Sequence, residues 1–227
     1  MKAFNGDQKL KEGLVREVNA HRLADRLIHG TYGADKTPDK FKGCAVGCSI
    51  HSYNKLANKN LRTNNHGAYE EFGIPRILAK IEDGIFEGLS RKDAQEWPVL
   101  FMNAVPVGAD LSGVWAKFAQ WLLTDSVHGV IRYAKTDEQK KAIQRVSDLY
   151  AKGKKATKEE FKKAARACRT ASAAAAYAAY AADAYAAAYA AAAADADAAR
   201  KKARRFQAEK LLELLRSAPV RKEKKAA

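Results

Sequence analysis

GIPRILAKIEDGIFEGL, residues 73–89, is the stretch that most clearly indicates the class of fold. Four large apolar residues recur in it at helical spacing: Ile74, Leu78, Ile81 and Ile85. Pro75 suits the first position of a helix, where its missing N–H costs nothing, and Gly88 suits the end. The stretch therefore predicts an amphipathic helix.

Helices are predicted on both sides of this stretch. Upstream, residues 7–29 and 43–56 fit helices, and His21 falls on the apolar stripe of the first. Downstream, Pro98 is expected to open a helix in the same way as Pro75. A further helix after Asp110 or Ser112 would carry a strong apolar face of Trp115, Phe118 and Leu122.

Two capping boxes extend the helical pattern into the second half of the chain. Thr136 and Gln139 form the first, and Thr157 and Glu160 form the second. We find no convincing strand-like alternation of β-branched residues. The sequence predicts an all-α protein with three parts: a helical globular core over residues 1–150, an alanine-rich helical region over 151–217 and a basic tail over 218–227.

The alanine-rich region is the most unusual part of the composition. Residues 171–199 contain 21 alanines, four tyrosines, three aspartates and one serine, so we expect a helix. A break is expected near residues 195–202, where Asp195 or Asp197 can cap a following helix. The tyrosines spread over about half of the helix surface: Tyr177, Tyr180, Tyr185 and Tyr189. They indicate either tight helix packing or a surface that recognises bases, a partner protein or a second copy.

The last predicted helix is amphipathic and runs into the tail. We expect four apolar side chains to dock it on the body of the protein: Phe206, Leu211, Leu214 and Leu215. Pro219 should end this helix, and the residues after it read as a solvated tail.

The net charge of +15 is unevenly distributed. Residues 1–134 carry +3, residues 135–170 carry +7, residues 171–199 carry −3 and residues 200–227 carry +8. Basic blocks favour anionic partners, namely nucleic acid, an acidic protein surface or anionic lipid, although they also keep an alanine-rich region soluble. The predicted nucleic-acid-binding residues are Lys154, Lys155, Lys162, Lys163, Arg166, Lys201, Lys202, Arg204 and Arg205.

The number of cysteines and the hydropathy of the chain predict the cellular compartment of the protein. Three cysteines, two of them closely spaced, are too few for a disulfide framework and favour a reducing cytoplasm. Residues 1–10 contain no apolar core of signal-peptide length. Alanine is too weakly hydrophobic for residues 171–199 to predict a membrane span, so we expect a cytoplasmic protein.

The stretch KGCAVGCSIH, residues 42–51, concentrates two cysteines and a histidine. On a helix, Cys44, Cys48 and His51 would share one face. One interpretation is a close-packed core helix in which the cysteines act as small hydrophobes. A second is a zinc site with a fourth ligand from His21, His66 or Glu70. A third is a cysteine nucleophile activated by His51 near a helix N-terminus.

The remaining chain offers little enzymatic signal. It contains no dinucleotide-binding or phosphate-binding glycine loop, no G-x-S-x-G elbow and no H-E-x-x-H motif. Glu82, Asp83 and Glu87 are close together in the sequence, and we interpret these three acidic residues as a solvated face that balances Arg76 and Lys80. Enzymatic activity is therefore unsupported by the sequence.

Four stretches carry a resemblance: GCAVGCSIH, GIPRILAKIEDGIFEGL, PVGADLSGVW and the alanine-rich segment that ends in QAEKLLELLR. Together they resemble a set of hypothetical proteins found in phage and bacterial genomes. The resemblance covers most of the chain and implies an intracellular protein carried by a mobile element, but no activity and no functional residue.

The leading hypothesis is a non-enzymatic protein that binds nucleic acid or a nucleoprotein through its basic blocks, with counter-defence or host takeover as the role. One alternative is a module that binds a host or phage protein, or a second copy of itself, through the tyrosine face. The other alternative is a metal- or thiol-dependent protein centred on Cys44, Cys48 and His51.

Overall fold

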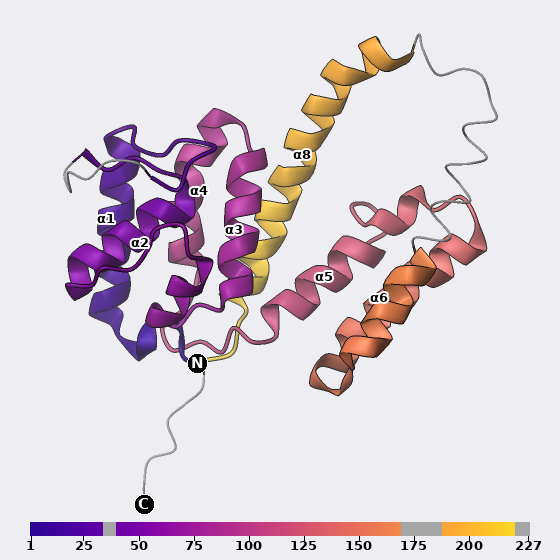
Figure 1. Cartoon of the computed structure of the whole chain (residues 1–227), viewed down its shortest axis with the longest axis horizontal. Helices are drawn as coiled ribbons and strands as arrows, with labels where there is room; N and C mark the ends of the chain where they lie inside the picture. The colour runs from indigo at the N-terminus through magenta and orange to yellow at the C-terminus, as the bar shows by residue number, and fades with distance from the viewer. Residues whose placement is uncertain (34–39, 169–187, 221–227) are drawn as a thin grey trace, which may run out of the picture. The chain divides into compact units, whose positions relative to one another are not determined.

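A computed structural model describes residues 1–33, 40–168 and 188–220, and it is helical over them, without a β-sheet (Figure 1). The α-helices are α1 (Gln8–Leu23), α2 (Ala45–Ala57), α3 (Arg76–Gly88), α4 (Arg91–Ala104), α5 (Val114–Thr124), α6 (Asp137–Lys152) and α8 (Ala188–Arg216). The shorter 3-10 elements are η1 (Ala3–Gly6), η3 (His66–Phe72), η4 (Val130–Tyr133) and η5 (Gly153–Lys155). Residues 158–168 are also helical. The predicted all-α class is confirmed.

The chain divides into two compact units. The first unit consists of Met1–Trp115 and Gln207–Ala227, and the second consists of Ala116–Phe206. The sequence placed a boundary near residue 150, but the structure places it at Trp115. The end of α8 also belongs to the first unit, a long-range association that no local pattern encodes.

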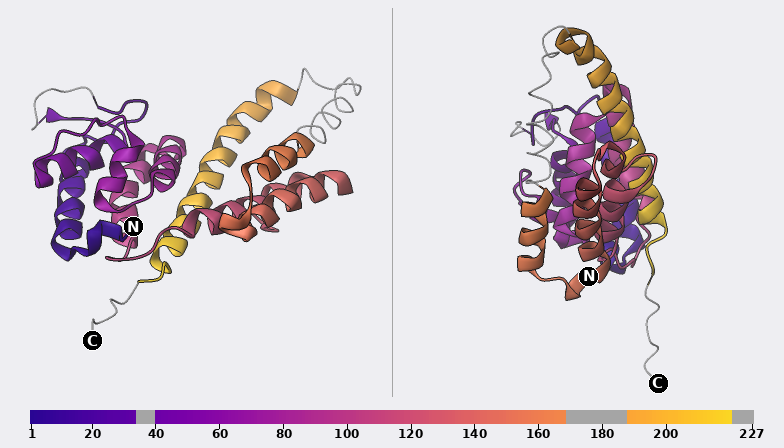
Figure 2. Two further views of the ribbon diagram at one scale, coloured as in Figure 1. Left: turned by 60° about the horizontal axis from the view of Figure 1, so that its bottom comes forward. Right: turned by 90° about the vertical axis from the view of Figure 1, so that its right-hand side faces the viewer.

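The first unit packs α1 to α4 around an aromatic core. The left view in Figure 2 shows these four helices gathered into one bundle. The largest side chains that are fully buried include Phe4, Tyr69, Phe86, Trp97 and Phe101. Burial of such side chains removes a large apolar area from water and is the main force that stabilises this unit.

Helix α2 is the most enclosed helix of the first unit. It packs against α1, α3 and α4, and every residue from 44 to 50 is buried. A Cβ atom added at Gly47 would lie 2.2 Å from the carbonyl oxygen of Tyr32, so only glycine allows the Tyr32 backbone to approach this closely. The interpretation of residues 42–51 as the start of a close-packed helix is confirmed.

Two predicted helix boundaries are wrong. Helix α1 ends at Leu23 rather than near residue 29, because Arg26 and Ile28 instead exchange backbone hydrogen bonds with Gly43. Pro98 lies inside α4 rather than at its start. The Ser90 hydroxyl accepts a hydrogen bond from the Asp93 N–H and begins that helix earlier.

Helix α8 also differs from the expectation. It runs without interruption from Ala188 to Arg216, through the break predicted at residues 195–202. An aspartate inside a helix costs only about 0.7 kcal/mol relative to alanine, which the many good helix formers around it offset. The leucine face is confirmed, because Leu211 and Leu215 are fully buried and Leu214 is 9% exposed.

The start of the tail is docked rather than solvated. The Asp110 N–H donates to the Pro219 carbonyl at 2.8 Å, and Ala109 forms an isolated bridge with Val220. Ala218 is buried. The predicted solvated tail is therefore wrong for Ala218, whereas Pro219 and Val220 are exposed although their backbones are bonded; residues 221–227 lie outside the described range.

The second unit contains the two predicted capping boxes, and both are present. The Thr136 hydroxyl accepts from the Gln139 N–H, and the Gln139 side chain bonds back to the Thr136 N–H. Thr157 and Glu160 make the same pair of contacts at 3.1 and 2.7 Å. Among the helices described, none combines the length and apolar character needed to cross a membrane.

Candidate functional site

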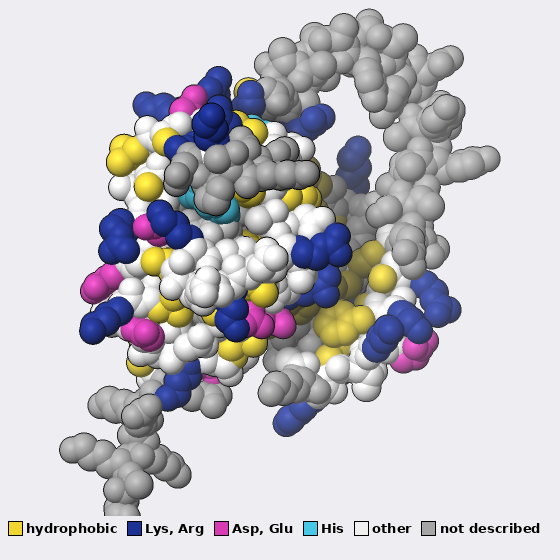
Figure 3. Space-filling model, turned by 60° about the vertical axis from the view of Figure 1, so that its left-hand side comes forward, with side chains coloured by type: hydrophobic (Ala, Val, Ile, Leu, Met, Phe, Trp, Pro, Cys, Tyr) yellow, Lys and Arg dark blue, Asp and Glu magenta, His cyan; other side chains and the backbone are white. Residues whose placement is uncertain are grey.

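The basic charge is concentrated in the second unit. This unit carries 19 lysines and arginines against nine aspartates and glutamates, a net charge of +10. The first unit, which is longer, carries 22 against 17, a net charge of +5. Figure 3 shows basic and acidic side chains interspersed over the face that it displays. The second unit is therefore the part of the chain that favours an anionic partner.

The first predicted basic block lies on residues 153–168. Lys155, Lys162, Lys163 and Arg166 are exposed. Lys162 and Arg166 both face Glu159, at 3.1 and 3.9 Å, as exposed pairs of the kind that contribute little to stability. Exposed pairs of this kind are readily exchanged for contacts with another anion. The side chain of Lys154 lies outside the described structure.

The second predicted basic block lies within α8. Arg200, Lys201, Lys202 and Arg205 are exposed, and Arg204 is half-buried. At about 100° per residue, these five bases cover roughly half of the helix circumference. Phe206 lies outside that arc, and its ring centroid is 4.1 Å from that of His128, also in the second unit. This contact docks the helix on the side of Phe206, and four of the five bases are exposed.

The side chains of the predicted tyrosine face lie outside the described part of the structure. Tyr177, Tyr180 and Tyr185 lie outside the described residues, and Tyr189 lies in α8 at a position where only the backbone is described. The partner-binding interpretation therefore stays a prediction.

The structure does not bring Cys44, Cys48 and His51 together. Cys44 precedes α2 as its N-cap, and its sulfur accepts from the Gly47 N–H at 3.4 Å. The Cys48 thiol donates to the Gly43 carbonyl at 3.5 Å. The His51 ring stacks on Phe41 at a centroid distance of 4.3 Å. The predicted shared face is lost because α2 begins one residue after Cys44.

Burial keeps both of these cysteines in the thiol form. It raises the pKa of Cys48 to about 12 and also raises the pKa of Cys44 above its ordinary value, where nearby Asp83 adds to the effect. A buried thiol with a raised pKa is a poor nucleophile at neutral pH. The geometry therefore gives no support to the interpretation of a thiol activated by His51.

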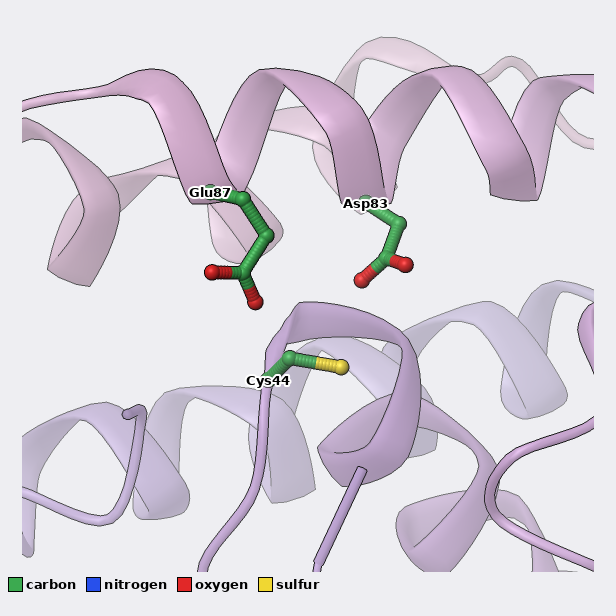
Figure 4. A group of neighbouring side chains, drawn as sticks. All are labelled: Cys44, Asp83 and Glu87. Atoms are coloured by element: carbon green, nitrogen blue, oxygen red, sulfur yellow. The ribbon is translucent and has the colours of Figure 1, made fainter. Parts of the chain in front are cut away.

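Cys44 instead faces two carboxylates of α3. Asp83 and Glu87, one helical turn apart, both point toward it (Figure 4). The Cys44 sulfur and one oxygen of each carboxylate lie within 4.8 Å of one another. No other group of three His, Cys, Asp or Glu side chains converges so closely in the described part of the chain. We call these three residues the acidic cluster.

Neighbouring groups fix the two carboxylates of the acidic cluster. The Tyr32 hydroxyl donates to Asp83 Oδ2 at 3.1 Å, and His66 Nε2 lies 3.0 Å from the same oxygen. The Gly30 N–H donates to the Glu87 carboxylate at 2.9 Å. Burial and the nearby Asp83 charge raise the pKa of Tyr32 to about 12, so its hydroxyl stays protonated and able to donate.

The prediction of a solvated acidic face is wrong for two of its three residues. Glu82 is fully buried, and burial raises its pKa well above the ordinary value, which favours the protonated form. Asp83 is only 9% exposed. The signal was present in the spacing: Glu82 lies four residues after Leu78 and three before Ile85, on the buried stripe.

Sequence reasoning also missed the contribution of Tyr32 and Tyr69. Tyr32 lies in a loop far from α3 in the sequence, and Tyr69 lies in η3 and is fully buried beside Glu82. No periodicity marks either residue, because Tyr32 lies in a loop and Tyr69 lies in a 3-10 turn. Of the fourth ligands considered, His66 does lie beside the acidic cluster, whereas His21 pairs with His51 at 3.2 Å.

A separate cavity is lined by residues of α1 and α2. Its volume is about 440 Å³, and its lining includes Glu17, His21, Arg26, His51 and Lys55. His21 is 5% exposed, as predicted for a core histidine, and its Nδ1 atom makes no hydrogen bond with the described residues. Burial, followed by the nearby His51, lowers the pKa of His21 to about 4.

Comparison with protein-family models, with curated proteins and with solved structures gives no match for this chain. The resemblance to hypothetical proteins of phages and bacteria therefore stays an expectation, and the function rests on the chemistry of the chain itself.

Proposed function

We propose that the second unit binds nucleic acid through the phosphate backbone. The observation that carries the proposal is a net charge of +10 over the 91 residues Ala116–Phe206, with exposed bases in both basic blocks. Each lysine or arginine that contacts a phosphate releases condensed counterions, which favours binding at moderate salt.

Two surfaces of the second unit suit this role. The first is the basic side of α8 at residues 200–205, a run of five bases and one alanine. The second is a groove of about 540 Å³ lined by three bases and two acids: Arg145, Lys152, Lys163, Asp148 and Glu160. Phosphate contacts position a protein without reading the base sequence, so we expect weak sequence preference.

The α8 surface supplies the sharper test. Lys201, Lys202, Arg204 and Arg205 are changed together to glutamine, and the affinity for short labelled DNA and RNA is measured by fluorescence anisotropy. We expect the affinity to fall at least tenfold. The slope of log K against log salt should also become shallower by up to about 3.6 for duplex DNA, because four phosphate contacts are lost.

A matched variant removes the same charge from the first unit. Lys9, Arg76, Lys80 and Lys92 are exposed there and are also changed to glutamine. This variant should retain most of the affinity. Equal losses in the two variants would contradict a located site and would leave only a general effect of net charge, whereas no binding by the unmodified protein would favour a protein partner.

A further inference from the structure

We propose that the acidic cluster, Cys44 with Asp83 and Glu87, binds one divalent transition-metal ion, with zinc as the preferred ion. This site lies wholly in the first unit and is independent of the proposed binding of nucleic acid. Its ligand set differs from the one that the cysteine and histidine spacing predicts.

The donor atoms suit zinc in type and in separation. Cysteine sulfur and carboxylate oxygen are both zinc ligands, at about 2.3 and 2.0 to 2.2 Å from the ion. Two ligands of one tetrahedral ion therefore lie about 3.3 to 3.7 Å apart. The three donor atoms are already within 4.8 Å of one another, so small side-chain rotations are enough to close the site.

The electrostatics of the acidic cluster also call for a cation. No lysine or arginine of the described chain forms an ion pair with Asp83 or Glu87, and His66 is the group that could supply a charge, at Asp83 Oδ2. Asp83 is about nine-tenths buried, and its Oδ1 atom makes no hydrogen bond there. The Cys44 thiol is the donor that faces this carboxylate, and a metal ion bound by both groups would replace the thiol proton.

The groups around the acidic cluster are suited to hold the ligands of a metal ion in place. Tyr32 and His66 both contact Oδ2 of Asp83, which leaves Oδ1 for an ion, and the Gly30 N–H holds Glu87. Hydrogen bonds of this kind orient metal-binding carboxylates. The Cys44 sulfur also caps α2 through Gly47, which fixes its direction. A bound ion would take the place of the thiol proton on Cys44.

The test measures zinc in the full-length, tag-free protein. The protein is stripped with EDTA, incubated with zinc, passed through a desalting column and analysed by inductively coupled plasma mass spectrometry. We expect one equivalent in the unmodified protein and less than a tenth of that in Cys44→Ser and Glu87→Gln. Serine is a good N-cap, so Cys44→Ser should keep α2 intact, which circular dichroism checks.

Two control variants remove a thiol and a carboxylate that lie outside the acidic cluster. Cys168→Ser removes a thiol of the second unit, and Asp25→Asn removes an exposed carboxylate that pairs with Arg91. Both should keep one equivalent. Loading with cobalt adds a second readout, because a thiolate-to-cobalt charge-transfer band should appear in Cys168→Ser and be absent in Cys44→Ser.

Two results would overturn the proposal. One is an unmodified protein that retains no zinc and shows no such cobalt band, which would mean that shared protons alone stabilise the acidic cluster. The other is equal metal retention in Cys44→Ser, Glu87→Gln and the unmodified protein, which would place the ion elsewhere.

Discussion

At the scale of single residues, Gly47 controls the approach of the Tyr32 backbone to α2. Gly47→Ala would place a methyl group 2.2 Å from the Tyr32 carbonyl, so the loop that carries Tyr32 must move. We expect a loss of about 2 to 3 kcal/mol in the free energy of unfolding, measured by urea denaturation.

Gly84→Ala provides the contrasting case. Gly84 lies inside α3, and an added Cβ meets no atom within 4 Å. Alanine is the better helix former by about 1 kcal/mol, so this variant should be as stable as the unmodified protein or more stable. Equal destabilisation by the two substitutions would contradict the packing described for α2.

His21 should make the first unit sensitive to acid. Its pKa of about 4 lies below the ordinary value of 6.5, so the unfolded chain takes up a proton before the folded chain does as the pH falls. Stability is therefore lost between about pH 6.5 and pH 4, by about 2 kcal/mol between pH 7 and pH 5. The groups that set the folded pKa, besides burial, are His51, Arg26, Glu17 and Lys55.

Urea denaturation at pH 7 and pH 5 measures this effect. His21→Gln should lose most of the difference in unfolding free energy between the two pH values. His29→Gln, which changes an exposed histidine, should keep it. A difference that is the same in all three proteins would show that other groups cause the acid sensitivity.

Prediction at the level of residues succeeded for His21 and failed for Cys44 and Glu82, for two different reasons. His21 is buried as its position on an apolar stripe indicates. Cys44 was placed on a helical face, but as an N-cap it points toward α3 instead. Glu82 was predicted to be solvated because of its charge, although its spacing from Leu78 places it on the buried stripe.

At the scale of elements, α6 depends on its capping box. Thr136→Ala removes the acceptor for the Gln139 N–H, and we expect a loss of about 1 kcal/mol in the stability of the second unit. Thermal unfolding followed by circular dichroism measures the loss. Thr136→Ser keeps the hydroxyl and should restore most of it; failure of serine to do so would argue against the cap as the cause.

The sequence predicted most helices but not all of their ends. Helix α3 was expected to start at Pro75 and begins at Arg76. The prediction is this close because the proline and the apolar repeat are both local signals. Helix α4 begins well before Pro98, because the Ser90 cap acts earlier in the chain. Element η3 was missed because a 3-10 turn has no apolar period of its own.

At the scale of the whole molecule, the composition predicted the helical class and the excess of positive charge. It did not predict that Gln207–Ala227 joins Met1–Trp115, because this association depends on contacts between residues about a hundred positions apart. That division is what separates a unit of net charge +10 from one of +5. The two proposals therefore fall in different units and can fail separately.

The salt dependence of nucleic-acid binding tests the central claim most directly. The unmodified protein is titrated against one labelled duplex at a series of salt concentrations, and the slope of log K against log salt is measured. If the bases of the second unit contact phosphates, the slope should be about −3.6 or steeper, because at least four contacts each contribute about −0.9. A slope near zero, or no binding at low salt, would contradict the proposed function.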